Sequence, residues 1–339
     1  MTMNSSGPIS LAGTTAGVSI EIENGGNGTT QISLNDSAVR TLAGVPSGAI
    51  TMPTNFYGKA NRVALSYTYS ANTANASLNV TSIGGYSSGK SDITITVNSG
   101  IYLYSTSISN AGLTLTGGNS GDTITLVNNG YIMGQGGHGG DGTHPGGQAG
   151  GTALSLGFAT TVNNTNGSAY IGGGGGGGCD YQVGGGGGAG GGNGGYTTTD
   201  GQGGAPGSAG TDGSAIFVSC CGCTWYNGDG GGGGRIFPGT GGAGGTVGGG
   251  AGGKGGGAGG GGGATHYVGN VGTAGGSGSS AGTDQGASNG GAGGGGWGAQ
   301  GGKNRSGTIN GTGGKAVALN GNSVTWTSGN TTRVYGAVA

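Results

Sequence analysis

Alternating hydrophobic and polar positions mark the first 130 residues of the chain. Alternation is strict at residues 61–69 and 91–97, and shorter alternating segments follow at residues 113–116 and 123–127. Turns rich in Gly, Asn and Ser separate these segments, as turns between short strands do. The pattern favours β structure throughout residues 59–130. It fits a small β-sandwich and the first coils of a β-solenoid equally well.

One short helix is expected before these strands. Residues 36–43 lack the alternation, and Asp36 can cap the first turn of a helix. Gly44 can adopt the left-handed conformation after the last turn, and Pro46 prevents the helix from continuing. We therefore expect residues 1–58 to form a small opening module with one helix.

A different pattern repeats beyond residue 130. Its unit is a short apolar segment, a polar turn, and a second apolar segment that leads into a run of glycines. Three copies occur, at residues 151–178, 213–234 and 314–326, and residues 334–335 close the chain without a further run. Such a repeat is typical of a stacked architecture whose last copy acts as a cap.

Composition changes at the same point. Of 101 glycines in 339 residues, 18 lie before residue 131 and the other 83 lie after it. This step predicts three parts: an N-terminal module at residues 1–58, a β-rich spacer at 59–130, and a glycine-rich domain at 131–339.

The glycine runs have few ordered conformations open to them. A collagen helix needs a strict Gly-X-Y repeat with much proline, and a phosphate-binding loop ends in Gly-Lys-Ser/Thr before a helix; neither pattern is present. The extended left-handed helix with about three residues per turn remains, and its backbone groups must pair with neighbouring chains. The sequence therefore predicts an all-β protein plus a bundle of polyglycine-II helices, with almost no α-helix.

Charge and hydropathy exclude several classes of protein. Only 6% of residues are charged and the net charge is −1, which argues against nucleic-acid binding. No apolar stretch approaches the roughly 20 residues that span a bilayer. The first residues carry neither the basic nor the apolar region of a signal peptide. We expect synthesis in a cytoplasm, and release by lysis would fit.

Candidate catalytic and metal-binding groups are sparse. Glu21 and Glu23 would lie on the solvated face of a half-buried strand at residues 18–23, rather than form the carboxylate pair of a glycosidase. Aspartates within the glycine-rich part have the surroundings of turn formers. His138 and His144 flank Asp141, a weak metal-site pattern for which exposed turn residues are the better interpretation. The expectation is a non-enzyme with no cofactor and no metal.

Four cysteines occur, and the three at residues 220–223 are too closely spaced for the usual zinc motifs. Partly buried free thiols are the favoured interpretation, with one disulfide left open. The four are Cys179, Cys220, Cys221 and Cys223.

Aromatic residues at the ends of the glycine runs have two interpretations. They either shield the ends of the bundle or act as rigid anchors for a ligand, as tyrosines do in antibody loops. Trp225 favours the first because it lies in a repeated apolar segment. The residues predicted to contact a binding partner are Tyr181, Gln182, Tyr196, Phe237, His266, Tyr267 and Trp297.

A family resemblance supports the second interpretation. Glycine runs joined by variable segments resemble the polyglycine domain of T-even-type phage tail-fibre adhesins. Residues 32–50 and 55–59 resemble an N-terminal module of phage tail proteins, and residues 324–326 with 334–336 resemble endings of such proteins. The resemblance implies a virion protein whose loops contact an outer-membrane receptor, with the glycine core as scaffold.

The sequence thus predicts a phage tail fibre or tail-tip adhesin. Residues 1–58 would attach to other tail proteins, and a homotrimer in the virion is left open. The host partner would be a surface protein or a glycan. Two alternatives are a purely structural tail-tip or baseplate component and an ice-binding protein built of glycine helices.

Overall fold

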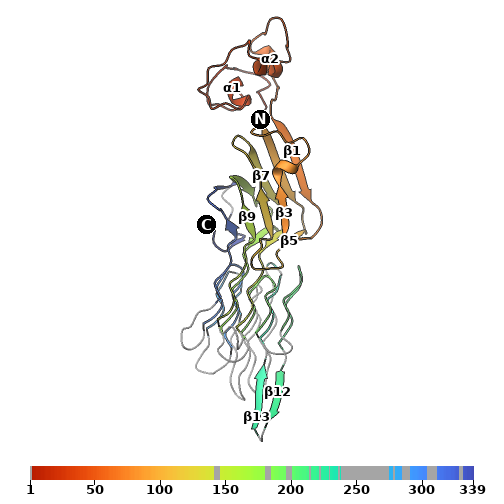
Figure 1. Cartoon of the computed structure of the whole chain (residues 1–339), viewed down its shortest axis with the longest axis vertical. Helices are drawn as coiled ribbons and strands as arrows, with labels where there is room; N and C mark the ends of the chain where they lie inside the picture. The colour runs from red at the N-terminus through yellow and green to blue at the C-terminus, as the bar shows by residue number, and fades with distance from the viewer. Residues whose placement is uncertain are drawn as a thin grey trace. The chain divides into compact units, whose positions relative to one another are not determined.

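The computed structural model of the chain falls into two compact units (Figure 1). The first unit comprises Met1–Thr68, Asn79–Thr96 and Thr116–Leu126, and the second comprises Tyr69–Leu78, Val97–Leu115 and Val127–Ala339. The structure describes residues 2–140, 146–179, 185–195, 201–213, 215–220, 223–228, 230–235, 237, 275–277, 279–284, 291–303, 311–327 and 331–339.

The first unit opens with a module built around two short helices. They are α1 (Ile20–Glu23) and α2 (Ser37–Ala43), followed by the 3-10 turns η1 (Thr54–Phe56) and η2 (Val80–Ser82). The predicted helix is confirmed as α2, and Gly44 ends it in the left-handed conformation with φ of 72°. Asp36 is the N-cap residue, but its side chain makes no capping hydrogen bond, because its carboxylate accepts the Ser33 N–H at 2.7 Å instead. The small core of the module consists of Met3, Ile20, Val39, Leu42, Ala43 and Phe56.

The strand expected at residues 18–23 is wrong, because this segment forms α1. The Ser19 hydroxyl caps the helix by accepting the Ile22 N–H at 3.3 Å. Glu21 and Glu23 are 2% and 1% exposed, so they do not form a solvated face. The Glu21 carboxylate accepts N–H groups of the following loop, including that of Asn27 at 2.9 Å. These hydrogen bonds compensate for the burial of the charge, which alternation alone cannot reveal.

Three strands lie mostly in the first unit. They are β1 (Val63–Tyr69), β4 (Ser91–Val97) and β7 (Thr123–Asn128). Arg62 forms an ion pair with Asp92, with Nη2 and Oδ1 2.8 Å apart. Burial would raise the pKa of Asp92, but hydrogen bonds from Arg62 and Thr123 and the charge of Arg62 hold it well below its usual range.

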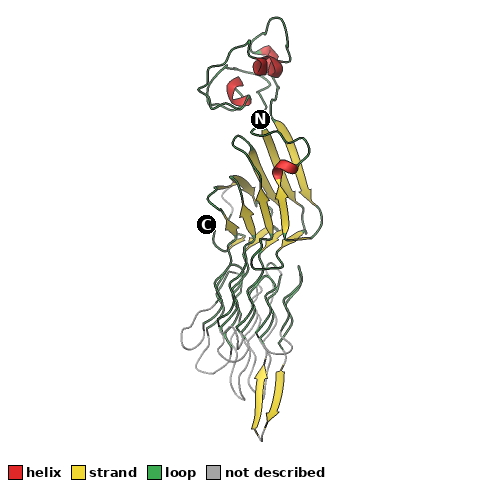
Figure 2. Cartoon of the chain, viewed as in Figure 1, coloured by secondary structure: helices red, strands yellow, loops and turns green. Residues whose placement is uncertain are grey.

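The second unit is a β-solenoid, one of the two architectures expected for the strands (Figure 2). One sheet has the order β16-β11-β8-β5-β2 and another the order β14-β9-β6-β3, while β10 and β15 pair in a third. Seven of the eight described pairings within this unit are parallel, and the β12–β13 hairpin is antiparallel. Along the chain, β8, β9 and β10 belong to the first, second and third sheet in turn. The strands β11, β14 and β15 follow the same order and form the next coil. The strands are β2 (Thr73–Ala74), β3 (Ala76–Asn79), β5 (Tyr102–Tyr104), β6 (Leu113–Thr116), β8 (Tyr131–Met133), β9 (Leu154–Leu156), β10 (Thr160–Asn163), β11 (Tyr170–Gly172), β14 (Val317–Ala318), β15 (Val324–Trp326) and β16 (Val334–Tyr335).

Aliphatic columns fill the interior of this solenoid. Leu103, Ile132 and Ile171 occupy equivalent positions on β5, β8 and β11 and are fully buried. A second column runs through Leu113, Leu154 and Val317 in the neighbouring sheet, and it is also fully buried. Because successive side chains of a strand face opposite sides, the residues between these positions face outward.

The glycine-rich segments are insertions between consecutive strands of the solenoid. The first insertion lies between β8 and β9, and the second lies between β11 and β14. Within the second insertion, β12 (Ala215–Cys220) and β13 (Cys223–Gly228) form an antiparallel hairpin in which Cys220 lies opposite Cys223. The segment predicted as glycine-rich therefore also contributes strands to the solenoid.

Hydrogen bonds within the glycine tracts repeat every third residue. Along the central tract, residues 173–179, Gly174 and Gly177 both donate to the segment 148–151, at 2.8 and 2.9 Å. Gly175 and Gly178 both donate to the segment 186–189, at 2.7 Å each. A third neighbour, the segment 299–302, accepts the N–H groups of Gly176 and Cys179 at 2.8 and 3.0 Å. This periodicity is the one expected of a helix with three residues per turn.

Three more segments donate to the same tract. Its carbonyl oxygens accept N–H groups from residues 137–140, 292–298 and 311–314, again with partners three residues apart. The central tract thus has six hydrogen-bonded neighbours. A Cβ added at Gly174 would overlap the Gln135 carbonyl, and one at Gly176 would overlap the Gly311 carbonyl. The tracts are packed too closely for side chains, and backbone pairing takes the place of a hydrophobic core.

Among the described residues, the α-helices are α1 and α2, in agreement with the predicted near-absence of α-helix. No described helix is long and apolar enough to cross a membrane.

Candidate functional site

The ends of several glycine tracts lie together in the second unit. Gly185 donates to the Gly140 carbonyl at 3.0 Å, and Gly195 donates to the Gly185 carbonyl at 2.8 Å. The Gly230 N–H is paired with the Gly195 carbonyl at 3.1 Å, and the Gly201 N–H with the Gly230 carbonyl at 3.1 Å. We call these five residues the tract-end cluster.

Two of the segments predicted to bind a receptor are flanked by the tract-end cluster. Residues 180–184 precede Gly185, and residues 196–200 lie between Gly195 and Gly201. Their own positions lie outside the described residues, as do Tyr181, Gln182, Tyr196, His266 and Tyr267. Cys179, which precedes the first of them, is a buried free thiol, as the sequence suggested for at least part of the cysteines.

Phe237 and Trp297 are described, and both are interior. Phe237 is 7% exposed and Trp297 is fully buried, and their rings stack with centroids 4.0 Å apart. Neither side chain presents an exposed anchor. At these two positions, burial favours the alternative interpretation, in which tract-end aromatics shield and pack the bundle.

The two rings complete an aromatic cluster on the outer side of a solenoid sheet. Tyr102, Tyr131 and Tyr170 occupy equivalent positions on β5, β8 and β11, and the first two rings stack at 4.6 Å. Phe237 packs against Tyr170 at 5.1 Å. These three tyrosines are not among the residues predicted from the sequence. The sequence feature that could have revealed them is a tyrosine followed by an aliphatic residue, which recurs at the start of each of these strands.

Gly172 explains why Phe237 fits. It stands opposite Met133 and Tyr335 in the sheet, so a side chain is missing from that column. A Cβ at Gly172 would overlap the Phe237 ring. Phe237 therefore fills the space that the glycine leaves.

Arg235 anchors the same segment. Its Nε donates to the Gly190 carbonyl at 2.8 Å, its Nη2 donates to the Gln135 side chain, and its guanidinium lies over the Tyr104 ring at 5.1 Å. Burial lowers the pKa of Arg235 to about 10, against the opposing effect of Tyr104, so the side chain remains charged at neutral pH. These contacts hold Arg235 and Phe237 in place.

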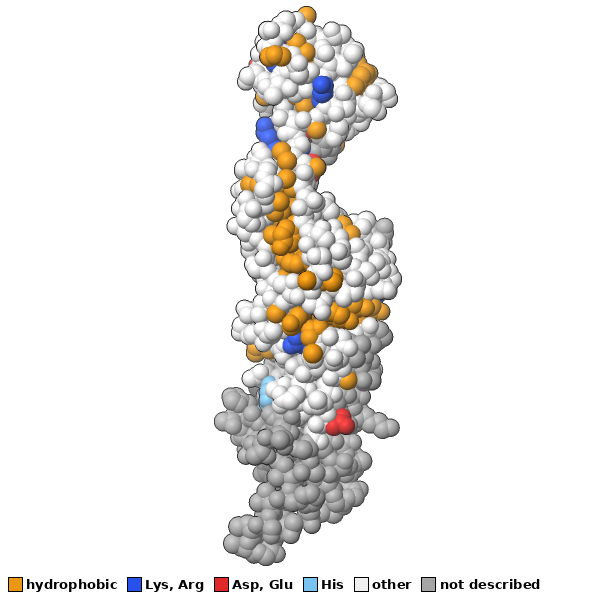
Figure 3. All heavy atoms as spheres, turned by 90° about the vertical axis from the view of Figure 1, so that its right-hand side faces the viewer, with side chains coloured by type: hydrophobic (Ala, Val, Ile, Leu, Met, Phe, Trp, Pro, Cys, Tyr) orange, Lys and Arg blue, Asp and Glu red, His pale blue; other side chains and the backbone are white. Residues whose placement is uncertain are grey.

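Chemistry-bearing groups are sparse on the surface. The face shown in Figure 3 carries few charged side chains among the described residues. His138 is half-buried and contacts the Gly139 carbonyl, while Asp141 and His144 lie outside the described residues. In the described part of the chain, no three His, Cys, Asp or Glu side chains come together as metal ligands.

Comparison with known proteins agrees with an adhesive role. The family model described as "Phage tail fibre adhesin Gp38" matches residues 64–245. The crystal structure of the gp37-gp38 adhesin tip complex of the bacteriophage S16 long tail fiber is similar, with a TM-score of 0.44 and 19% sequence identity. That alignment covers 97% of this chain and 100% of the other. A comparison with curated protein sequences finds no significant match.

Proposed function

This chain belongs to the family of phage tail fibre adhesins described as Gp38, and from that premise we propose that it binds a receptor on the host cell surface. It is a component of the virion tail, and its family acts by adhesion rather than by catalysis. The proposed contact residues lie in the segments that interrupt the glycine tracts, with Tyr181, Gln182, Tyr196, His266 and Tyr267 as anchors.

The observation that carries this proposal is the tract-end cluster. Segments of unrelated sequence adjoin glycines that are linked by hydrogen bonds: Gly195 is bonded to Gly185, and Gly201 is connected to Gly195 through Gly230. A segment fixed at both ends loses less conformational entropy when it binds a partner. Variable segments on a constant support are typical of recognition surfaces.

The three-residue repeat of hydrogen bonds supports a more specific proposal for the support itself. We infer that the tracts are polyglycine-II helices packed side by side, each with up to six neighbours. Neighbouring tracts run in both directions. Residues 174 and 177 pair with residues 151 and 148, so that neighbour is antiparallel, whereas residues 176 and 179 pair with residues 299 and 302, so that neighbour is parallel. Lateral pairing of this kind makes a rigid block without side chains.

Residues 1–58 are the proposed attachment to other tail proteins. This segment has its own small core around Phe56 and Leu42, which is what a separate docking module requires. Assembly as a homotrimer, synthesis in the host cytoplasm and release by lysis belong to the same proposal. A purely structural tail-tip role is the alternative.

Adsorption of assembled particles tests the receptor proposal. We expect the double variant Tyr181→Ala/Tyr267→Ala to assemble normally and to lower the adsorption rate at least tenfold, because two aromatic anchors are removed. Tyr67→Ala is the control, since Tyr67 is a 39% exposed aromatic far along the chain from the tracts. Phe237 is left intact because its burial would mix a folding defect with a binding defect. Normal adsorption of the double variant would favour the structural alternative.

A further inference from the structure

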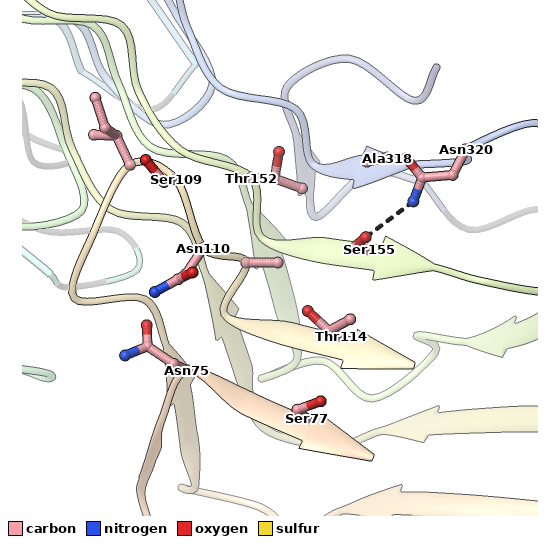
Figure 4. Close-up of a pocket in the computed structure, with 11 residues that line it drawn as sticks. Asn75, Ser77, Ser109, Asn110, Thr114, Thr152, Ser155, Ala318 and Asn320 are labelled. Carbon is pink, nitrogen blue, oxygen red and sulfur yellow. Dashed lines mark hydrogen bonds between the residues drawn. The ribbon is translucent and has the colours of Figure 1, made fainter. Parts of the chain in front are cut away.

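A groove crosses the outer face of the sheet β14-β9-β6-β3 in the second unit (Figure 4). Its volume is about 450 Å³, within the range of small-ligand sites. A smaller pocket of about 260 Å³ shares Ile108 with it and continues towards the glycine tracts. Ile108 is 40% exposed and stands between the two. We call the larger one the lateral groove.

The floor of the lateral groove is a row of small side chains, one from each strand. Thr114 stands opposite Ser155, Ser155 stands opposite Ala318, and Ser77 occupies the floor on β3. Neighbouring strands are about 4.8 Å apart, so the hydroxyl groups are spaced at that interval. Figure 4 shows these side chains beside Asn75, Asn110 and Thr152.

Some of the polar groups hold the walls of the groove. The Asn75 amide donates to the Thr106 hydroxyl at 2.7 Å, and the Asn320 amide donates to the Ser155 hydroxyl at 3.0 Å. Asn320 has a positive φ of 50°, which its amide contacts stabilise. The walls are therefore pre-formed.

Other polar groups of the groove have no partner in the described part of the chain. The side chains of Ser77, Asn110, Thr114 and Thr152 make no hydrogen bond there, although all four line the same space. Each hydroxyl can both donate and accept, and the amide of Asn110 can do the same. The site thus offers several free donors and acceptors at fixed spacing.

The chemistry of the lining selects the class of ligand. None of the eleven lining residues is charged, so the groove lacks the Arg or Lys that would hold a phosphate or carboxylate. The groove lies over the face of the sheet, where the inner strands β6 and β9 already pair with a neighbour on each side, so a peptide strand cannot add there. A ligand whose own groups are neutral and also donate and accept fits best. We propose that the lateral groove binds a neutral oligosaccharide.

This site is separate from the tract-end cluster and does not depend on receptor binding there. Titration of the purified full chain with neutral trisaccharides of glucose, galactose and N-acetylglucosamine, followed by saturation-transfer NMR and calorimetry, tests it. We expect at least one to bind with a dissociation constant of about 1 mM or below. A trisaccharide of the same length that carries uronic acids should bind more weakly.

Matched variants locate the site. Thr114→Val keeps the volume but removes a hydroxyl, and Ser77→Ala changes an exposed residue that does not support the fold. Together they should weaken binding at least tenfold. Thr161→Val, at a half-buried threonine of β10 on another sheet, should leave both binding and melting unchanged. The Tyr181→Ala/Tyr267→Ala variant should also retain sugar binding, which separates this proposal from the receptor proposal.

Three results would overturn the proposal: no binding of any neutral trisaccharide, unchanged affinity in Ser77→Ala/Thr114→Val, or equal loss in Thr161→Val. Loss of association with another tail protein in the groove variant, without any sugar binding, would identify the groove as a protein interface instead.

Discussion

Single glycines decide whether the tracts can pack. A Cβ added at Gly175 would overlap the carbonyl oxygens of Gly295 and Gly296. It would also disturb the hydrogen bond from Gly175 to the Ala189 carbonyl, now 2.7 Å long. At Gly167, in contrast, an added Cβ meets no atom within 4 Å. The same residue type is therefore essential in one place and replaceable in another.

We expect Gly175→Ala to lower the free energy of unfolding by about 3 kcal/mol or more, because neighbouring backbones must move apart. Gly167→Ala should change it by less than about 0.5 kcal/mol. Urea denaturation of both variants checks this. Equal stability of the two would show that the tracts are not closely packed.

A second prediction at this scale concerns the ion pair between Arg62 and Asp92. Asp92→Asn should lower stability by about 1–2 kcal/mol at neutral pH, since it removes a charge-assisted hydrogen bond. The folded-state pKa of Asp92 is depressed, so its contribution is complete above the unfolded pKa of about 4 and is lost as pH falls through the lower folded value. The difference in free energy of unfolding between the wild-type protein and Asp92→Asn should therefore be larger at pH 7 than at pH 3, as measured by denaturation curves at both pH values. A stability difference that grows as the pH falls would contradict the lowered pKa of Asp92.

At the scale of elements, the aromatic cluster joins the solenoid to a glycine-rich segment. Phe237 lies between Tyr170 and Trp297, with centroid distances of 5.1 and 4.0 Å, over the space at Gly172. We expect Phe237→Ala to cost about 3–4 kcal/mol by leaving a cavity. Phe237→Leu should cost less because it fills part of that space. Thermal melting with near-ultraviolet circular dichroism measures both effects, and a Phe237→Ala variant as stable as Tyr67→Ala would disprove the packing role.

Local signals predicted some elements and not others. The helix at Ser37–Ala43 could be predicted because its start and its terminal Gly44 carry sequence signals. Alternation misassigned Ile20–Glu23, because the burial of Glu21 depends on N–H groups supplied by a later loop. A sandwich and a solenoid share the same alternation. Their difference lies in which strands pair, and β11 pairs with β16 across more than 160 residues.

The candidate site shows the same limit. Glycine tracts and the variable segments between them are visible in the sequence, so the scaffold could be predicted. The interior position of Phe237 could not be predicted, because it depends on Gly172, which stands opposite Tyr335 in a sheet formed by segments far apart in the sequence. The lateral groove was also missed, since Ser77, Thr114 and Ser155 are ordinary outward-facing residues until the register aligns them.

At the scale of the second unit, the solenoid and the tracts should unfold together. The central tract continues directly from β11, and its first N–H, that of Gly173, is paired with the Tyr335 carbonyl at 2.9 Å. We expect amide hydrogens of residues 173–178 to exchange as slowly as those of β11. Hydrogen exchange followed by mass spectrometry of overlapping peptides measures this. Exchange of the tract within seconds, beside a protected β11, would show that it opens independently.

The six-neighbour packing of the central tract has a thermal consequence. Unfolding normally raises the heat capacity because apolar surface becomes hydrated, whereas newly exposed peptide groups lower it. The tracts bury chiefly peptide groups, so the heat-capacity change per residue should fall below the usual value of about 12–15 cal/mol/K. A smaller change flattens the curve of stability against temperature. A particle that waits outside its host in cold or warm surroundings would thereby keep its adhesive surface folded over a broader range than an apolar core of equal size permits.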